Sequence, residues 1–206
     1  MRSFLPPRGF FVEVGAFDPI DLSQTFHLEQ QGWDGLLIEP VPAHAEKLRS
    51  VRRSPVVQVA CGSPAQHGNS LPIYVAGGRS SLRYPHGPAI DVPIVTLDSI
   101  LADAGVSRIE FLSVDVEGAE IDVLSGFSFD RFRPNLILIE DFADDHTRHR
   151  FMRERDYKRV RRTGDNSWYV PAEVDFPVSL FGRFQLLRKY YLSMPLRHLK
   201  KRLEYR

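Results

Sequence analysis

Residues 10–40, FFVEVGAFDPIDLSQTFHLEQQGWDGLLIEP, contain the pattern that decides the fold class. Apolar runs at residues 10–14 and 35–39 each have the length of one buried strand and end at a residue that interrupts a strand. Gly15 permits a turn after the first run, and Pro40 stops the second because proline has no amide hydrogen. Two parallel strands joined by a helix are therefore predicted.

Two helices and a third strand complete the first half of the predicted sheet. The helix between the two strands is predicted at residues 23–31, because Ser23 can accept the first free amide hydrogens and Gly32 can end the helix. A second amphipathic helix at residues 43–51 and a strand at residues 56–61 follow. This order of strands and helices is that of half a doubly wound sheet.

The alternation of strands and helices resumes after an irregular stretch, residues 62–91, where we expect substrate loops. The further elements expected are a strand at 92–95, a helix at 97–104, a strand at 109–114, a helix at 119–124, a strand at 136–139, a helix at 145–155, and terminal strands at 157–161 and 167–170. The last two strands are joined by a Gly- and Asn-containing turn that suits an antiparallel hairpin. The predicted fold is therefore α/β, with a single doubly wound, Rossmann-like sheet that is mostly parallel and ends in an antiparallel hairpin.

Composition predicts one soluble domain and no membrane span, because 43% of the 206 residues are apolar and no apolar run reaches eighteen residues. Residues 1–9 contain no signal-peptide core, so a cytoplasmic location is expected. The single cysteine, Cys61, can form no internal disulfide and lacks the partners of a zinc site, which agrees with a reducing compartment.

The charge is unevenly distributed along the chain. Residues 181–206 contain eight Lys or Arg and one Glu, whereas residues 1–180 contain 19 basic and 25 acidic residues. We expect a domain at residues 1–175 and a basic, amphipathic, helical tail at residues 176–206, divided by Pro195. Peripheral contact of the tail with an anionic membrane is one hypothesis, and packing on the domain or on another subunit is the alternative. An acidic body does not resemble a nucleic-acid-binding surface.

Four residues at the ends of the first two strands are candidates for cofactor binding. In a doubly wound sheet, ligands bind beyond the carboxyl ends of the strands. Gly15 permits close backbone approach, and Glu13 or Asp18 could accept a hydrogen bond from an ammonium or a hydroxyl group. Glu39 lies 24 residues after Gly15, the placement expected of an acid that accepts both hydroxyls of a ribose. The alternative for Glu39 is a solvent-facing strand end.

The glycine pattern of a dinucleotide site is absent from this turn. Position 17 is Phe, and Pro19 stands near where a later glycine would fall, so a pyrophosphate cradle and an NAD-dependent dehydrogenase are not supported. A nucleoside without phosphates fits better. S-adenosylmethionine is such a ligand, since it needs an open glycine turn and two acids.

Four segments of the chain together resemble the FkbM-type methyltransferase family. They are FFVEVGAFDPIDLSQTFHLEQQGWDGLLIEPVPAHAEKL, VTLDSIL, IEFLSVDVEGAEIDVLSGFSFDRFRPNLILIED and DNSWYV, and the match runs through about residues 10–170. The resemblance implies a class I S-adenosylmethionine-dependent methyltransferase fold. It also implies methylation of a hydroxyl oxygen on a small-molecule or glycan acceptor, such as a sugar, a lipid-linked glycan or a polyketide-type natural product.

The resemblance assigns Glu13 and Gly15 to the cofactor turn and Glu39 to the ribose. It places the motif at residues 115–120 beside the methyl donor. The sequence also departs from the family, which often has Asp at position 13, Asn at position 17 and Gly at position 19. These departures affect the contacts that the turn would make with the amino-acid part of the cofactor.

Asp115 and Glu117 are the catalytic candidates. Methylation of an alcohol requires removal of a proton, and a carboxylate in a dry pocket is a stronger base than one in water. Asp115 is our first candidate for that base, and its rival role is hydrogen bonding within the cofactor turn. Glu117 could share a helix face with Glu120, or it could be an acid favoured by the helix dipole at the first turn.

The sequence leaves three further questions open: a metal site, the role of Cys61 and the alternative functions. We make no firm metal prediction, but Asp115, Glu140 and Asp141 could bind a divalent cation through oxygens. Cys61 ends the third strand, where a neighbour often meets the adenine, although buried cysteines are usually packing residues. A non-catalytic adenosyl-binding module and an RNA-modifying methyltransferase that uses the basic tail are the alternative functions, and the presence of Glu39 and Asp115 argues against the first.

Overall fold

The computed structural model of the chain describes residues 4–75, 77, 80, 82, 87–141 and 146–192. A seven-stranded sheet with the strand order β3-β2-β1-β7-β8-β10-β9 forms its centre. The strands are β1 (Phe10–Val14), β2 (Asp34–Ile38), β3 (Val56–Val57), β7 (Phe111–Val114), β8 (Leu136–Glu140), β9 (Tyr157–Thr163) and β10 (Asn166–Pro171). Neighbouring strands from β3 to β8 pair in parallel, so the prediction of an α/β fold with a mostly parallel sheet is confirmed. β10 is antiparallel to both β8 and β9.

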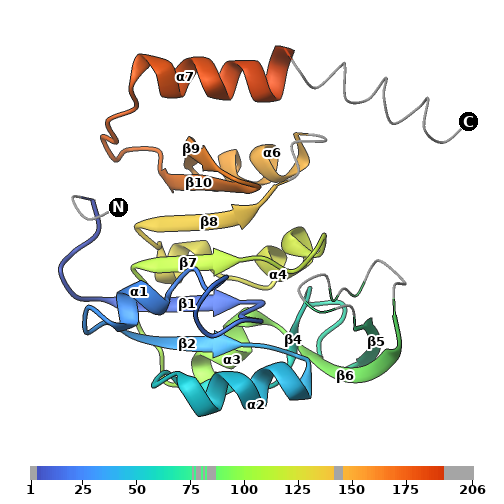
Figure 1. Ribbon diagram of the computed structural model, residues 1–206. Helices are drawn as coiled ribbons and strands as arrows, with labels where there is room; N and C mark the ends of the chain where they lie inside the picture. Colours follow the sequence, from blue (N-terminus) through green and yellow to red (C-terminus); the bar gives the residue numbers. More distant parts are fainter. Residues whose placement is uncertain are drawn as a thin grey trace, which may run out of the picture.

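The helices lie between these strands in the sequence. They are α1 (Phe26–Glu29), α2 (Pro42–Val51), α3 (Leu97–Asp103), α4 (Glu120–Ser125), α5 (Phe129–Phe132), α6 (Thr147–Arg153) and α7 (Leu180–Leu187), which continues into a π-helical turn, Arg188–Leu192. The arrowheads of β1, β2, β7 and β8 all point to one side of the molecule in Figure 1. The carboxyl ends of four strands therefore lie along one edge.

Apolar side chains are buried on both faces of the sheet. In β8, Leu136 and Leu138 belong to one apolar cluster, whereas Ile137 and Ile139 belong to another. Successive side chains of a strand point to opposite faces, so the two clusters lie on opposite sides of the sheet. Buried faces on both sides explain why the strands are continuous apolar runs in the sequence.

The strand predicted at residues 56–61 is two strands in different sheets, which corrects the prediction. Val56 and Val57 pair with β2, and the chain then leaves the main sheet. Ala60–Cys61 forms β4, which pairs in parallel with β6 (Ala89–Val95) in a second, three-stranded sheet. The continuous apolar run hid this change of sheet, because both halves are strands.

The irregular stretch predicted at residues 62–91 contains a strand of its own. β5 (Ser70–Tyr74) pairs with β6, which is longer than the strand predicted at residues 92–95. Pro72 lies on β5, an edge strand, where a missing amide hydrogen is tolerated. Proline therefore concealed this strand from the sequence analysis. The small sheet lies beside the ends of β1 and β2 (Figure 1).

The helix predicted at residues 23–31 is shorter than expected. Ser23 accepts hydrogen bonds from the amides of Thr25 and Phe26, as predicted, but it does so in a turn, and regular helix is confined to Phe26–Glu29. No helix in the described residues is both long and apolar enough to cross a membrane. The predicted division of the tail at Pro195 lies outside the described residues.

The tail is fastened to the domain by one fully buried side chain, Tyr190. Its hydroxyl donates to Asp141 Oδ2 at 2.8 Å, accepts from Arg162 at 2.7 Å, and lies 2.6 Å from the Ser167 hydroxyl. The guanidinium of Arg159 lies over its ring, 3.2 Å from the centroid. The tail therefore docks on the terminal hairpin through a hydrogen-bonded tyrosine.

We expect Tyr190→Phe to lower the free energy of unfolding by about 1–3 kcal/mol, because it leaves buried partners of the hydroxyl unsatisfied. Urea denaturation measures this loss. Tyr191→Phe is the matched control, since Tyr191 is 55% exposed, and it should change stability by less than about 0.5 kcal/mol. Equal stability of the two variants would contradict a docked tail.

Candidate functional site

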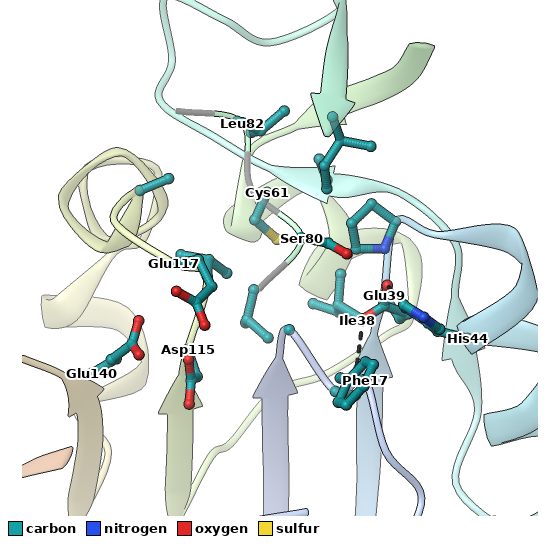
Figure 2. A pocket seen from close by; sticks show the side chains of 18 of the residues that line it. Phe17, Ile38, Glu39, His44, Cys61, Ser80, Leu82, Asp115, Glu117 and Glu140 are labelled. Carbon is teal, nitrogen blue, oxygen red and sulfur yellow. Dashed lines mark hydrogen bonds and ion pairs between the residues drawn. The ribbon is translucent and has the colours of Figure 1, made fainter. Parts of the chain in front are cut away.

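A cavity of about 270 Å³ lies at the carboxyl ends of the parallel strands. Its floor is formed by residues that follow β1, β2 and β7 and by the last residue of β8, and its far wall comes from the small sheet. Figure 2 shows Phe17, Glu39 and His44 on one side of the cavity and Asp115, Glu117 and Glu140 on the other. The structure thus brings together residues from four separate segments of the chain.

Gly15 forms the turn between these two sides. Its φ is +82°, and an added Cβ would lie 1.8 Å from the carbonyl oxygen of Asp115. The Gly15 amide donates to the carbonyl of Ile38 at 3.0 Å, and the Asp115 amide donates to the carbonyl of Val14 at 3.0 Å. Only glycine allows the ends of β1, β2 and β7 to meet this closely.

Glu39 is buried in the cavity wall at the end of β2. Its Oε2 accepts from the Phe17 amide at 3.0 Å, and its Oε1 accepts from the Val41 amide at 2.9 Å. His44 Nδ1 lies 3.4 Å from Oε1. A carboxylate has about four acceptor positions, so two backbone donors leave capacity for a ligand. Glu39 is only 4% exposed, so the alternative of a solvent-facing strand end is wrong.

Phe17 and His44 are cavity residues that sequence reasoning missed. Their rings make an edge-to-face contact, with centroids 4.7 Å apart. Phe17 has a φ of +36°, a conformation that Asn adopts more readily than Phe. The frequent Asn at this position in the family that the sequence resembles was the signal that could have revealed it.

Asp115, Glu117 and Glu140 form an acidic cluster, and one oxygen of each lies within 4.8 Å of those of the other two. Burial raises the pKa of Glu140, and repulsion from Asp115 and Glu117 raises it further. Burial also raises the pKa of Asp115, to which repulsion from Glu120 adds. Both carboxyls therefore hold a proton more strongly than they would in water.

The backbone after β7 presents Glu117 to the cavity. Glu117 has a φ of +53° and Gly118 one of +103°, so two successive residues are left-handed. Glu120 Oε1 accepts from the Gly118 amide at 2.8 Å, and its Oε2 accepts two hydrogen bonds from Arg148. α4 begins only at Glu120, so Glu117 lies before the helix, and the predicted shared helix face does not form.

Glu13 does not line the cavity but supports its rim. Its carboxylate accepts from the Ser23 hydroxyl at 2.9 Å, the Gln24 amide at 2.7 Å and the Thr25 hydroxyl. Arg52 lies 3.8 Å away. Gln24 itself lines the cavity, so Glu13 positions the loop that carries it.

Asp18 and Asp141, two other predicted site residues, also lie outside the cavity lining. Asp18 accepts from the amides of Ile20 and Asp21, and its hydrogen bond from Lys47, at 2.8 Å, lowers its pKa to about 2. Asp141 points to the tail, where it accepts from Tyr190. The metal candidates that the structure brings together are thus Asp115 and Glu140, joined by Glu117.

Cys61 lies in the cavity wall that β4 supplies, next to Val59 and Ala60. It is 4% exposed, and burial raises the pKa of its thiol, so the thiol stays protonated. This wall is apolar, whereas the opposite floor is acidic. No Lys or Arg is among the described residues that line the cavity.

Comparisons with known proteins show which family the chain resembles. The family model described as "Methyltransferase FkbM domain" matches residues 13–159, which confirms the resemblance predicted from the sequence. The crystal structure of Methyltransferase FkbM from Methylobacillus flagellatus KT has a similar fold, with a TM-score of 0.53 and 17% sequence identity. The match covers 80% of this chain and 44% of that one. No curated protein matched the sequence.

We expect Gly15→Ala to destabilise the protein far more than Gly32→Ala. Gly32 has nearly the same φ, +86°, but an added Cβ would meet nothing within 4 Å. Both variants lose about 1–2 kcal/mol to left-handed backbone strain. Gly15→Ala should lose roughly 1–3 kcal/mol more, because its Cβ collides with the Asp115 carbonyl. Urea unfolding measures both, and equal losses would refute the tight junction.

Proposed function

Because the chain belongs to the FkbM methyltransferase family, we propose that it transfers a methyl group from S-adenosylmethionine to a hydroxyl oxygen of a sugar, glycan or polyketide-type natural product. One observation carries the proposal. The cavity at the strand ends combines a glycine turn with four carboxylates and, among the residues described, no Lys or Arg. The order of the strands around β1, expected for a doubly wound sheet, also supports it.

The cavity fits the charge of the proposed cofactor. S-adenosylmethionine has a positive sulfur and an ammonium group against one carboxylate, so it is cationic overall. A lining with Glu39, Asp115, Glu117 and Glu140 attracts such a ligand. The same lining disfavours NAD, because a pyrophosphate would face carboxylates without a described Lys or Arg to balance it.

The shape of the cavity fits a nucleoside. Gly15 and Ala16, which line the cavity at the turn, have no side chain or only a methyl group, so a ligand can approach the backbone there. Glu39 remains able to accept from ribose hydroxyls, because its two backbone donors use only part of its acceptor capacity. Phe17 and the apolar wall that contains Cys61 offer surfaces for the adenine.

The acid pair Asp115 and Glu140 can remove the proton of the acceptor. Burial and repulsion from its neighbours raise the pKa of Glu140 to about 9 and that of Asp115 only to about 6, so Glu140 keeps the proton that the two carboxyls share. Asp115 is then the carboxylate that accepts the hydroxyl proton as the O–H bond breaks. When bound, S-adenosylmethionine supplies a methyl group attached to a positive sulfur. The sulfur keeps the electron pair of the S–C bond when that bond breaks. The chain itself orients the hydroxyl group.

Binding of the cofactor is the first experiment. We expect calorimetric titration to detect S-adenosylmethionine binding and no comparable binding of NAD. Glu39→Ala should weaken the binding tenfold or more, which corresponds to about 1.4 kcal/mol, because it removes the ribose acceptor.

The control is Glu46→Ala, which removes an exposed acid of α2 and should leave the affinity unchanged. Glu39→Gln separates charge from shape, since it keeps the side-chain volume and should also weaken binding. Circular dichroism verifies that each variant is folded. Tighter binding of NAD than of S-adenosylmethionine would overturn the proposal, as would full affinity in a folded Glu39→Ala protein.

A further inference from the structure

The acidic cluster of the cavity has the composition of a cation site. Asp115 follows β7, Glu117 lies in the next loop and Glu140 ends β8, so three separate positions converge (Figure 2). Hard divalent cations prefer such carboxylate oxygens, and opposed ligands of Mg²⁺ lie about 4.2 Å apart, those of Ca²⁺ about 5 Å. The oxygens lie within 4.8 Å of one another, which is inside the span of a Ca²⁺-sized ion and requires them to move closer by up to about 0.6 Å around Mg²⁺.

Glu140 gives a second reason to expect a ligand there. It is 7% exposed, and its buried Oε2 has no hydrogen-bond partner among the described residues. Buried carboxylate oxygens are normally satisfied, because an unpaired one has lost its water without compensation. Figure 2 shows this carboxyl group directed toward Asp115.

A fourth acid behind the cluster, Glu120, has a cationic partner of its own. Arg148 donates from Nε and Nη2 to Glu120 Oε2, at 3.0 and 2.8 Å. Glu120 is fully buried, so its ion pair with Arg148 neutralises the acid behind the cluster.

We propose that Asp115, Glu117 and Glu140 bind one divalent cation of the Mg²⁺ or Mn²⁺ type, which also holds the hydroxyl group of the acceptor. The role of this cation in catalysis rests on the proposed methyl transfer, whereas its binding does not. The cation lowers the pKa of the bound hydroxyl, the O–H proton passes to water, and the oxygen forms the new bond to the methyl carbon. The S–C electron pair stays on sulfur. When the cation is bound, Asp115 is one of its ligands and no longer accepts the hydroxyl proton. The cation then activates the hydroxyl group in its place.

Manganese binding tests the proposal without any need for an acceptor. In electron paramagnetic resonance titrations of the full chain, we expect one equivalent of Mn²⁺ to bind and Mg²⁺ to displace it. Glu140→Gln and Glu117→Gln should each weaken Mn²⁺ binding tenfold or more. Glu154→Gln, which alters an acid with a side chain that is 63% exposed, is the matched control and should bind as the parent does.

Two results would overturn the metal proposal. One is the absence of stoichiometric Mn²⁺ binding both with and without S-adenosylmethionine, and the other is full binding in both folded glutamine variants. Titration of S-adenosylmethionine in the presence of EDTA tests the proposed function separately. Cofactor binding without metal binding would therefore refute only the cation site.

A different observation concerns the outer surface of α7. Six large apolar side chains on α7 and the turn after it are 49–84% exposed: Leu180, Phe181, Phe184, Leu187, Tyr191 and Leu192. Four of them, at positions 180, 184, 187 and 191, have the spacing of one helix stripe. α7 lies beyond the terminal hairpin, at the edge of the molecule in Figure 1.

Positive charge surrounds this stripe. No acid occurs at residues 176–192, Arg183 and Arg188 are exposed, and the sequence beyond residue 192 adds five Lys or Arg against one Glu. A groove of about 910 Å³ beneath the helix is also lined by Arg161 and Arg188. The buried Tyr190 fixes the helix on the hairpin, so the stripe is held in place.

We infer that α7 docks on an anionic lipid surface. Apolar side chains beside basic ones are the pattern of interfacial helices. A symmetric contact with a second copy of the chain would bring like charges together, which disfavours that occupant.

Vesicle sedimentation tests the docking with the full chain. We expect binding to phosphatidylcholine vesicles only when they contain phosphatidylglycerol, and at least a tenfold loss in the double variant Phe184→Ser, Leu187→Ser, which changes two residues of the stripe. Val51→Ser, which changes an exposed apolar residue of α2, should bind as the parent does. Equal binding to neutral vesicles, no binding, or a dimer in solution that the double variant abolishes would overturn the inference.

Discussion

The contact between the turn at Gly15 and the backbone of Asp115 is the constraint on which the site depends. It joins the ends of β1 and β7 without room for a single methyl group, while the amide of Gly15 ties the same turn to β2. The strand ends therefore form one surface, and the side chains that follow them, Glu39 and Asp115, face the same cavity. A wider turn would move the carboxylates of Glu39 and Asp115 apart.

Two kinds of acid surround this junction, and the structure distinguishes them by their partners. Glu13 and Glu120 are buried with hydrogen-bond donors and an arginine each, Arg52 and Arg148, so they stabilise the loops at the rim. Asp115 and Glu140 face the cavity and repel each other. The repulsion between Asp115 and Glu140 is relieved when a proton or a cation binds between them.

Much of the fold was predictable because the main strands are buried on both faces and appear as apolar runs, as in residues 10–14 and 136–139. Gly15, Glu39, Asp115 and Glu140 could be placed at one site, since parallel strands end at one edge, whereas Cys61 reaches the cavity from the second sheet. The partners of Glu13, Asp18 and Asp141 could not be predicted, because Arg52, Lys47 and Tyr190 lie far from them in sequence. The change of sheet after Val57 left no local mark, since both halves of the run favour strands.

Because of that change of sheet, the cavity is lined by residues of two separate sheets. The main sheet carries the carboxylates, whereas β4, β5 and β6 form a separate platform that contributes the apolar wall through Cys61 and Ile73. Because β5 is an edge strand paired only with β6, insertions and exchanges there leave the register of the seven-stranded sheet intact. The apolar wall of the cavity can therefore change in shape while the carboxylates at the strand ends keep their positions.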